Sequence, residues 1–461
     1  MADQGRRVVG RFGAVPMPPH HSLRCRIIGL AIVAATVVTY ALVASRLERV
    51  WISGPMVFLA AGVVIGPAVT DQLPVTVGHD AARVVTEGTL ALVLFADASM
   101  LRLWAVERDA WTPGRLLLVG LPLTMAFGTL LALGLFPGIG LAAAALIAVI
   151  VAPTDAALGM AVVTNPSVPR RIRRTLNVES GLNDGIATPF VAVLVTIVVA
   201  EERVEGGSAA VQAVAEVGLA LVAALVVGGL GGRLLCAAHE RGWTSPQSEQ
   251  LAIIGLALLS YGFSVAIGGN GFIAAFAGGL LFGAATERML EARVEFTEAT
   301  AVLASYLVWI IFGAIFVGPV LAAGVELAPI LYAVASLTLI RMLPVAAALL
   351  RTGFRLPTVL FIGWFAPRGL ASVVFALVAL EALGAEGLVA DTVAVAVTWT
   401  VLLSVAAHGI TAPSLARAFG DWTTTLGDVP ETMAVPEPRS RLRTILDEHG
   451  LHVRPSRDRR P

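Results

Sequence analysis

The segment NVESGLNDG, residues 177–185, opens a long apolar stretch of the chain. In a helix, with about 100° between successive residues, its polar side chains fall within an arc of about 140° in the first two turns: Glu179, Ser180, Asn183 and Asp184. Two carboxylates, a hydroxyl and an amide on one face suit a monovalent cation or a proton, and acids inside membrane helices indicate functional sites. A solvated helix entrance outside the hydrocarbon fits this segment equally well, so the surrounding sequence decides.

The composition identifies the class of protein. Of the 461 residues, 57% are hydrophobic and 14% are charged, whereas about 25% are charged in soluble domains. We therefore predict an all-α polytopic membrane protein. The net charge of zero argues against nucleic-acid partners. Cys25 and Cys236 are too few for a disulfide framework or a thiolate metal site, and we expect no cofactor.

Hydropathy predicts about thirteen transmembrane helices, although twelve remains possible if some spans merge. The spans lie near residues 27–45, 53–70, 84–100, 114–135, 138–163, 176–200, 209–236, 249–268, 270–286, 299–318, 325–350, 357–381 and 389–413. The chain is thus predicted to have an N-terminal tail over 1–26, a transmembrane domain over 27–415 and a flexible cytoplasmic tail over 416–461.

Arginine sets the predicted orientation in the cell membrane. Sixteen arginines flank alternate loops, whereas the opposite loops carry only Arg83 and Arg203. The positive-inside rule then places the C-terminus in the cytoplasm. Thirteen spans would place the N-terminus outside, where its own arginines violate the rule, so the location of the N-terminus stays open.

Two spans are interrupted near their middle by proline and a charge, at residues 152–157 (APTDAA) and 366–370 (APRGL). Proline removes a backbone donor and clashes with the preceding turn, so both helices are expected to break there. Paired broken helices in corresponding halves indicate a transporter binding site, and a packing kink is the alternative. We predict two inverted repeats, spans 1–6 and 8–13, with the two broken helices crossing in the core.

Charges at membrane depth need partners, and six such residues are present: Asp97, Asp155, Glu179, Asp184, Arg341 and Arg368. We expect Arg368 to pair with Glu179. Arg341 is either a second site residue or, more often for such a position, a snorkelling or core-pairing arginine near the cytoplasmic end. Asp184 is then the single carboxylate that either a proton or a cation neutralises. The empty, charged form crosses the low-dielectric barrier only at high cost, so electroneutral one-for-one exchange by alternating access follows.

Three motifs together resemble the NhaP-type Na⁺/H⁺ exchangers of the first monovalent cation:proton antiporter family. They are Pro153-Thr154-Asp155, Glu179-Ser180-x-x-Asn183-Asp184 and Pro367-Arg368-Gly369, and the stretch around Asp97 also resembles that family. The resemblance covers about residues 27–415. It implies thirteen helices in a homodimer, with a mobile core over about 114–200 and 325–413 and a dimerisation scaffold over about 27–100 and 209–318.

The resemblance also implies roles for site residues. Asp184 would bind the cation, Na⁺ most readily or else K⁺ or Li⁺, and the proton. Thr154, Ser180 and Glu179 would assist the site, Asn183 would steady it, and Arg368 would pair with Glu179. The chain departs from the family by having Ala156 where a proline is usual, and Asp155 can still cap a half-helix N-terminus facing it.

Other classes of function remain to be separated from exchange. A cation channel could use the same acidic patch, and a proton-coupled transporter of another small solute could use the same fold. We find no His-Glu-x-x-His motif, no Gly-x-Ser-x-Gly elbow and no suitably placed pair of catalytic aspartates. We therefore do not expect an intramembrane enzyme.

Overall fold

A computed structural model describes residues 19–49, 52–66, 69, 79–100, 111–155, 158–203, 209–286, 291–384, 387–427 and 429–432. Within these residues every regular element is a helix, so the all-α class is confirmed. Most of the predicted N-terminal tail over 1–26 and residues 433–461 of the predicted C-terminal tail lie outside the described residues.

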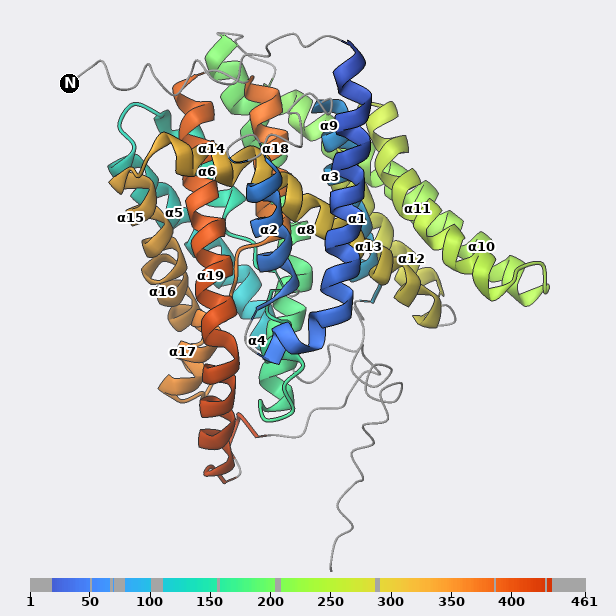
Figure 1. Cartoon of the computed structure of the whole chain (residues 1–461). Helices are drawn as coiled ribbons and strands as arrows, with labels where there is room; N and C mark the ends of the chain where they lie inside the picture. Colours follow the sequence, from blue (N-terminus) through green and yellow to red (C-terminus); the bar gives the residue numbers. More distant parts are fainter. Residues whose placement is uncertain are drawn as a thin grey trace, which may run out of the picture.

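The helices follow one another along the chain as shown in Figure 1. They are α1 (Pro19–Arg49), α2 (Gly54–Ile65), α3 (His79–Met100), α4 (Trp111–Arg115), α5 (Leu121–Leu135), α6 (Gly140–Ile150), α7 (Met160–Val163), α8 (Arg170–Arg203), α9 (Ala209–Ala223), α10 (Gly231–Glu240), α11 (Pro246–Ala266), α12 (Gly271–Thr286), α13 (Glu291–Phe312), α14 (Gly318–Ala323), α15 (Leu327–Leu337), α16 (Leu339–Ala348), α17 (Leu356–Trp364), α18 (Leu370–Leu383) and α19 (Leu388–Thr424). Three π-helical segments join α4 to α5, α9 to α10 and α13 to α14.

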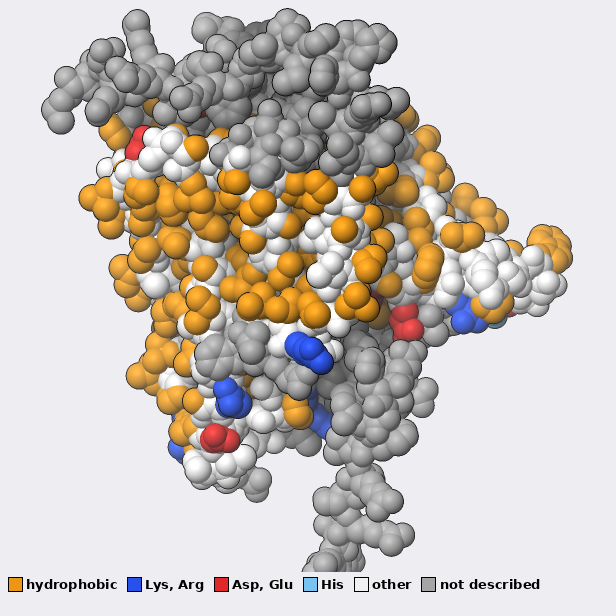
Figure 2. Space-filling model, viewed as in Figure 1, with side chains coloured by type: hydrophobic (Ala, Val, Ile, Leu, Met, Phe, Trp, Pro, Cys, Tyr) orange, Lys and Arg blue, Asp and Glu red, His pale blue; other side chains and the backbone are white. Residues whose placement is uncertain are grey.

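The described helices have the lengths and compositions of a multi-pass membrane protein. Eight continuous helical runs are long and apolar enough to cross a membrane, and α2, α6, α12 and α18 are shorter apolar helices. Figure 2 shows a broad belt of hydrophobic side chains across the visible face, with arginine side chains below it. The count of thirteen transmembrane helices stays a prediction.

Both predicted helix breaks are confirmed. The first interrupted span ends α6 at Ile150, and helix resumes only at Met160 in α7. In the second, α17 ends at Trp364 and α18 begins at Leu370. The Asp155 backbone N–H donates to the Pro367 carbonyl at 2.8 Å, so the two breaks lie against each other. The two inverted repeats stay a prediction.

Helix α8 lies between two groups of helices. It contacts α6 and α18 on one side and α9 and α12 on the other, and Figure 1 shows it in the middle of the molecule. A Cβ at Gly185 would overlap the ring of Phe276 in α12, so glycine allows this close approach of the two helices. Glu179 and Asn183 of the polar segment are buried in this arrangement.

The predicted flexible tail is shorter than expected at its start. Helix α19 continues to Thr424, past the predicted boundary at 415/416. Beyond it, Glu431 is fully buried, and its Oε1 accepts bonds from the Arg355 N–H (2.8 Å) and the Thr358 hydroxyl (3.1 Å). Arg171 Nη1 also donates to the Pro430 carbonyl at 2.7 Å. Residues 430–431 therefore join the first turn of α17 to the start of α8.

We expect Glu431→Ala to destabilise the protein. The change leaves the Arg355 N–H and the Thr358 hydroxyl without their acceptor, and a buried donor that loses its partner costs about 1–3 kcal/mol. The melting temperature in detergent should fall, whereas Glu431→Gln, which keeps an Oε1 acceptor, should lower it less. An alanine variant with the same melting temperature as the wild type would show that this contact does not stabilise the protein.

Candidate functional site

The polar segment NVESGLNDG lies deeper in its helix than predicted. Helix α8 begins at Arg170, directly after Pro169, so the arginine run 170–174 is helical and the acids follow in later turns. Proline before the first helical residue and arginines of good helix propensity explain this earlier start. Glu179 and Asn183 are only 2% and 1% exposed, which excludes the solvated helix entrance.

A hydrogen-bonded cluster joins this face of α8 to the break after α6. Thr154, 2% exposed, lies in the non-helical segment of the break. Its Oγ1 is 3.0 Å from Ser180 Oγ and accepts a bond from Asn183 Nδ2 at 2.5 Å. The sequence prediction thus named three residues that the fold brings together. The break supplies this contact because α6 ends at Ile150, so the Thr154 side chain is not held in the helical position that it would have in a continuous helix.

The partner of Glu179 differs from the prediction. Arg341 of α16, not Arg368, forms the ion pair, with 2.5 Å between Arg341 Nη2 and Glu179 Oε1. Arg341 is 1% exposed, so it is a core-pairing arginine and not a snorkelling one. A buried ion pair of this kind needs both partners, because removing one leaves an uncompensated charge.

Arg368 instead satisfies the backbone of the other break. Its Nη1 donates to the Ala152 carbonyl at 2.5 Å and lies 3.4 Å from the Pro153 carbonyl. Carbonyls at the end of a broken helix lose their helical partners and must find others inside a membrane protein. Arg368 is fully buried and supplies these bonds, which explains why it is not placed on Glu179.

Asp155 caps the second half-helix. Its Oδ2 accepts the Leu370 N–H of α18 at 2.9 Å, and a carboxylate at a helix N-terminus also interacts favourably with the helix dipole. A Cβ at Gly369 would overlap this carboxylate, so glycine is needed where the two breaks meet. Asp155 thus caps the half-helix that faces it, as expected despite Ala156, which lies outside the described residues.

Asp184 differs from the other acids of the site. Its Oδ1 is buried without a hydrogen-bond partner in the described part of the chain, and so is Oδ1 of the neighbouring Asn183. The carboxylates of Asp155 and Asp97 interact electrostatically with Asp184. The carboxylate can bind a proton, and both oxygens are suitable ligands for a hard monovalent cation.

Two residues that hold the site were missed by sequence reasoning. Ser404 Oγ of α19 accepts the Arg368 N–H at 2.6 Å, and His408 Nε2 lies 2.8 Å from the Trp364 carbonyl. Both groups serve backbone that the break between α17 and α18 exposes. The four-residue spacing of Ser404 and His408 on an apolar helix was the available signal, because such positions share a face.

Comparison with known proteins identifies relatives. A family model described as "Sodium/hydrogen exchanger, transmembrane" matches residues 32–418. The Na⁺/H⁺ antiporter NhaS2 of Synechocystis sp. is 30% identical over 162 residues, which span 35% of this chain and 29% of that protein. The chain thus matches less than a third of the length of this curated relative.

Solved structures show the same fold. The sodium proton antiporter MjNhaP1 from Methanocaldococcus jannaschii at pH 8 has a TM-score of 0.68 and 20% identity, covering 86% of this chain and 99% of that one. A second structure of MjNhaP1, from an electron microscopy map, has a TM-score of 0.63 and 21% identity, with coverages of 85% and 97%. At these identities the likeness concerns the fold alone.

Proposed function

The chain belongs to the sodium/hydrogen exchanger family, and on that premise we propose that it exchanges a monovalent cation for H⁺ across the cell membrane. Na⁺ is the first candidate, and K⁺ and Li⁺ are the others. The family is one of transporters, so this is a secondary antiport and not an enzymatic reaction. The relative NhaS2, which is named as a Na⁺/H⁺ antiporter, supports the proposal.

The observation that carries the proposal is the burial of the Asp184 carboxylate and its unsatisfied oxygen. The carboxylate Oδ1 is buried and has no hydrogen-bond partner among the described residues, and the same holds for the amide oxygen of Asn183, the preceding residue. A carboxylate is neutral when protonated and when it holds a monovalent cation, but charged when empty. Because burying an unpaired charge is costly, only the two loaded forms cross easily, and one-for-one electroneutral exchange follows.

The neighbouring residues have supporting roles in this proposal. Thr154, Ser180 and Asn183 orient the oxygen-rich face of α8, and the Glu179–Arg341 pair cancels its own charge. Asp155 ties the two half-helices together, and the carboxylate of Asp97 adds negative potential near Asp184.

The larger architecture follows from the sequence predictions. We propose that residues 114–200 and 325–413 form a core that moves against a scaffold of residues 27–100 and 209–318. The proposal further includes a homodimer and a cytoplasmic C-terminus. Cross-linking in native membranes tests the dimer, and a C-terminal reporter tests the orientation.

The mechanism is tested by the dependence of exchange on pH and voltage. If proton and cation compete for Asp184, lowering the pH should raise the apparent KM for Na⁺. The rise should be about tenfold for each pH unit below the pH at which protons occupy most sites. The rate should also fall at high pH, because too few protonated carriers return, which gives a bell-shaped profile. Proton flux in proteoliposomes with Na⁺, Li⁺ or K⁺ measures both.

Potentials set by valinomycin and K⁺ complete the test. A neutral carrier in both directions predicts that the Na⁺ and H⁺ gradients at which net exchange reverses do not move with voltage. A reversal point that shifts with voltage would disprove the single-carboxylate mechanism. Cation conductance without proton coupling would instead favour a channel, and proton flux driven only by another solute would favour a different coupled transporter.

A further inference from the structure

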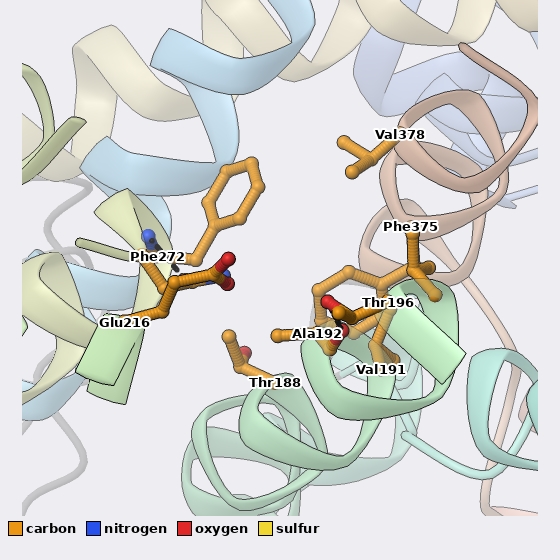
Figure 3. Close-up of a pocket in the computed structure, with 10 residues that line it drawn as sticks. Thr188, Val191, Ala192, Thr196, Glu216, Phe272, Phe375 and Val378 are labelled. Carbon is orange, nitrogen blue, oxygen red and sulfur yellow. Dashed lines mark hydrogen bonds between the residues drawn. The ribbon is translucent and has the colours of Figure 1, made fainter. Parts of the chain in front are cut away.

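A cavity of about 180 Å³ lies beside α8, just beyond the candidate site. One wall comes from α8 and α18, and the other from α9, α12 and the turn before α12. Figure 3 shows Thr188, Thr196 and Phe375 on one side and Glu216 and Phe272 on the other. The first wall belongs to the predicted core, and the second to the predicted scaffold.

The cavity continues the face of α8 that carries Asp184. The cavity residues Thr188, Val191 and Val195 follow Asp184 at intervals of four, three and four residues, which form one stripe along a helix. The Thr188 hydroxyl, 2% exposed, donates to the Asp184 carbonyl at 2.8 Å. The cavity therefore begins one helical turn from Asp184 and extends toward the Arg203 end of α8.

Glu216 of α9 is the one carboxylate among the residues that line this cavity. Figure 3 shows its carboxylate pointing into the space between the two walls. Gln212 Nε2 donates to Glu216 Oε1 at 3.0 Å, and within the described residues no basic side chain pairs with this carboxylate. The Asn270 N–H donates to the Glu216 carbonyl at 3.2 Å, which fixes α9 against the start of α12.

We propose that Glu216 is a positioning residue for the transported cation, which it attracts into the cavity on the way to or from Asp184. This inference rests on the proposed exchange function. A carboxylate without a basic partner, set in a cavity with apolar walls, raises the local concentration of cations because such walls focus its field. Glu216 does not exchange the proton; it acts through the occupancy of Asp184.

The expected effect is on apparent affinity and not on the maximal rate. We expect Glu216→Gln to raise the apparent KM for Na⁺ by about 3- to 10-fold with a nearly unchanged maximal rate. A change in KM of this size is what one charge produces when it acts through a partly aqueous path. Glutamine keeps the shape of the side chain and an acceptor for Gln212. Glu216→Asp keeps the charge and should stay near the wild-type KM.

The control is Glu326→Gln, the same charge removal at an exposed position that does not line the cavity. Glu326 precedes α15, which contacts α5, α16 and α19, helices that do not line the cavity. Initial rates of Na⁺-driven proton flux in proteoliposomes are measured for all variants. They are repeated with N-methyl-D-glucamine chloride raised from about 0.01 M to about 1 M, where the Debye length falls from about 30 Å to about 3 Å.

The proposal expects the KM difference between Glu216→Gln and wild type to shrink at high salt, with Glu326→Gln unchanged throughout. A Glu216→Gln variant with the wild-type KM would overturn the proposal, because the carboxylate would then not attract the cation. A variant with a lower maximal rate and an unchanged KM would also overturn it, because a purely structural role lowers the rate and leaves the salt-dependent KM unchanged. Failure of the proposed exchange function is distinguishable, since the wild-type protein would then show no cation-driven proton flux at all.

Discussion

Asp184→Asn is expected to abolish cation-driven proton exchange while the protein stays folded. The amide has nearly the volume of the carboxylate, but it neither takes up a proton nor neutralises a cation. Both loaded forms of the carrier are lost, so proton flux in proteoliposomes should fall to the level of liposomes without protein. This is the largest functional effect that we expect from a single conservative substitution.

The fold should tolerate this change. Asp184 Oδ1 has no hydrogen-bond partner in the part of the chain that the structure describes. The Thr188 hydroxyl donates to the backbone carbonyl at position 184, which the substitution keeps. Removing a charge that repels Asp155 and Asp97 should leave the melting temperature at or above that of the wild type. Asp421→Asn, the same change at an exposed position of α19, is the matched control and should exchange normally. Exchange by a well-folded Asp184→Asn protein would refute the site.

The local elements of the site were predictable because each has its cause within a few residues. Pro153 and Pro367 each stand within two residues of a charge in an apolar stretch, and proline removes a backbone donor. Helices α8, α16 and α19 each keep a proline inside them, so proline together with the charge predicted the breaks and proline alone did not. The spacing of Glu179, Ser180 and Asn183 places them on one face of a helix, whatever packs against it. Thr154 then reached that face because the break directed it there.

The partners across helices were not predictable from such spacing. Arg341 and Arg368 both lie in apolar spans with equal charge, and the sequence does not say which of them faces Glu179. Which arginine pairs with Glu179 depends on the backbone carbonyls that a helix break exposes. Arg368 donates to one of these, the Ala152 carbonyl. Glu431 is a similar case, because a lone glutamate in a proline-rich segment has no pattern that predicts its burial against α17.

The Glu179–Arg341 pair should show the largest effect on stability. Removing either charge by Glu179→Gln or Arg341→Met leaves the other buried without a partner, which typically costs about 3–5 kcal/mol. The double variant removes both charges, so it should cost less than the sum of the single changes by about 1–3 kcal/mol. Denaturation of the purified variants in detergent measures the four corners of this cycle.

A second cycle with Arg368→Met in place of Arg341→Met separates the two arginines. Arg368 donates to carbonyls of the α6 break, and its removal strands those groups with or without Glu179. Glu179→Gln and Arg368→Met should therefore be closer to additive than Glu179→Gln and Arg341→Met. Equal or stronger coupling of Glu179 to Arg368 would show that the charge of Arg368, and not that of Arg341, balances Glu179. Arg341 would then be free to neutralise another carboxylate, and Asp184 would no longer be the one carboxylate left for the proton and the cation.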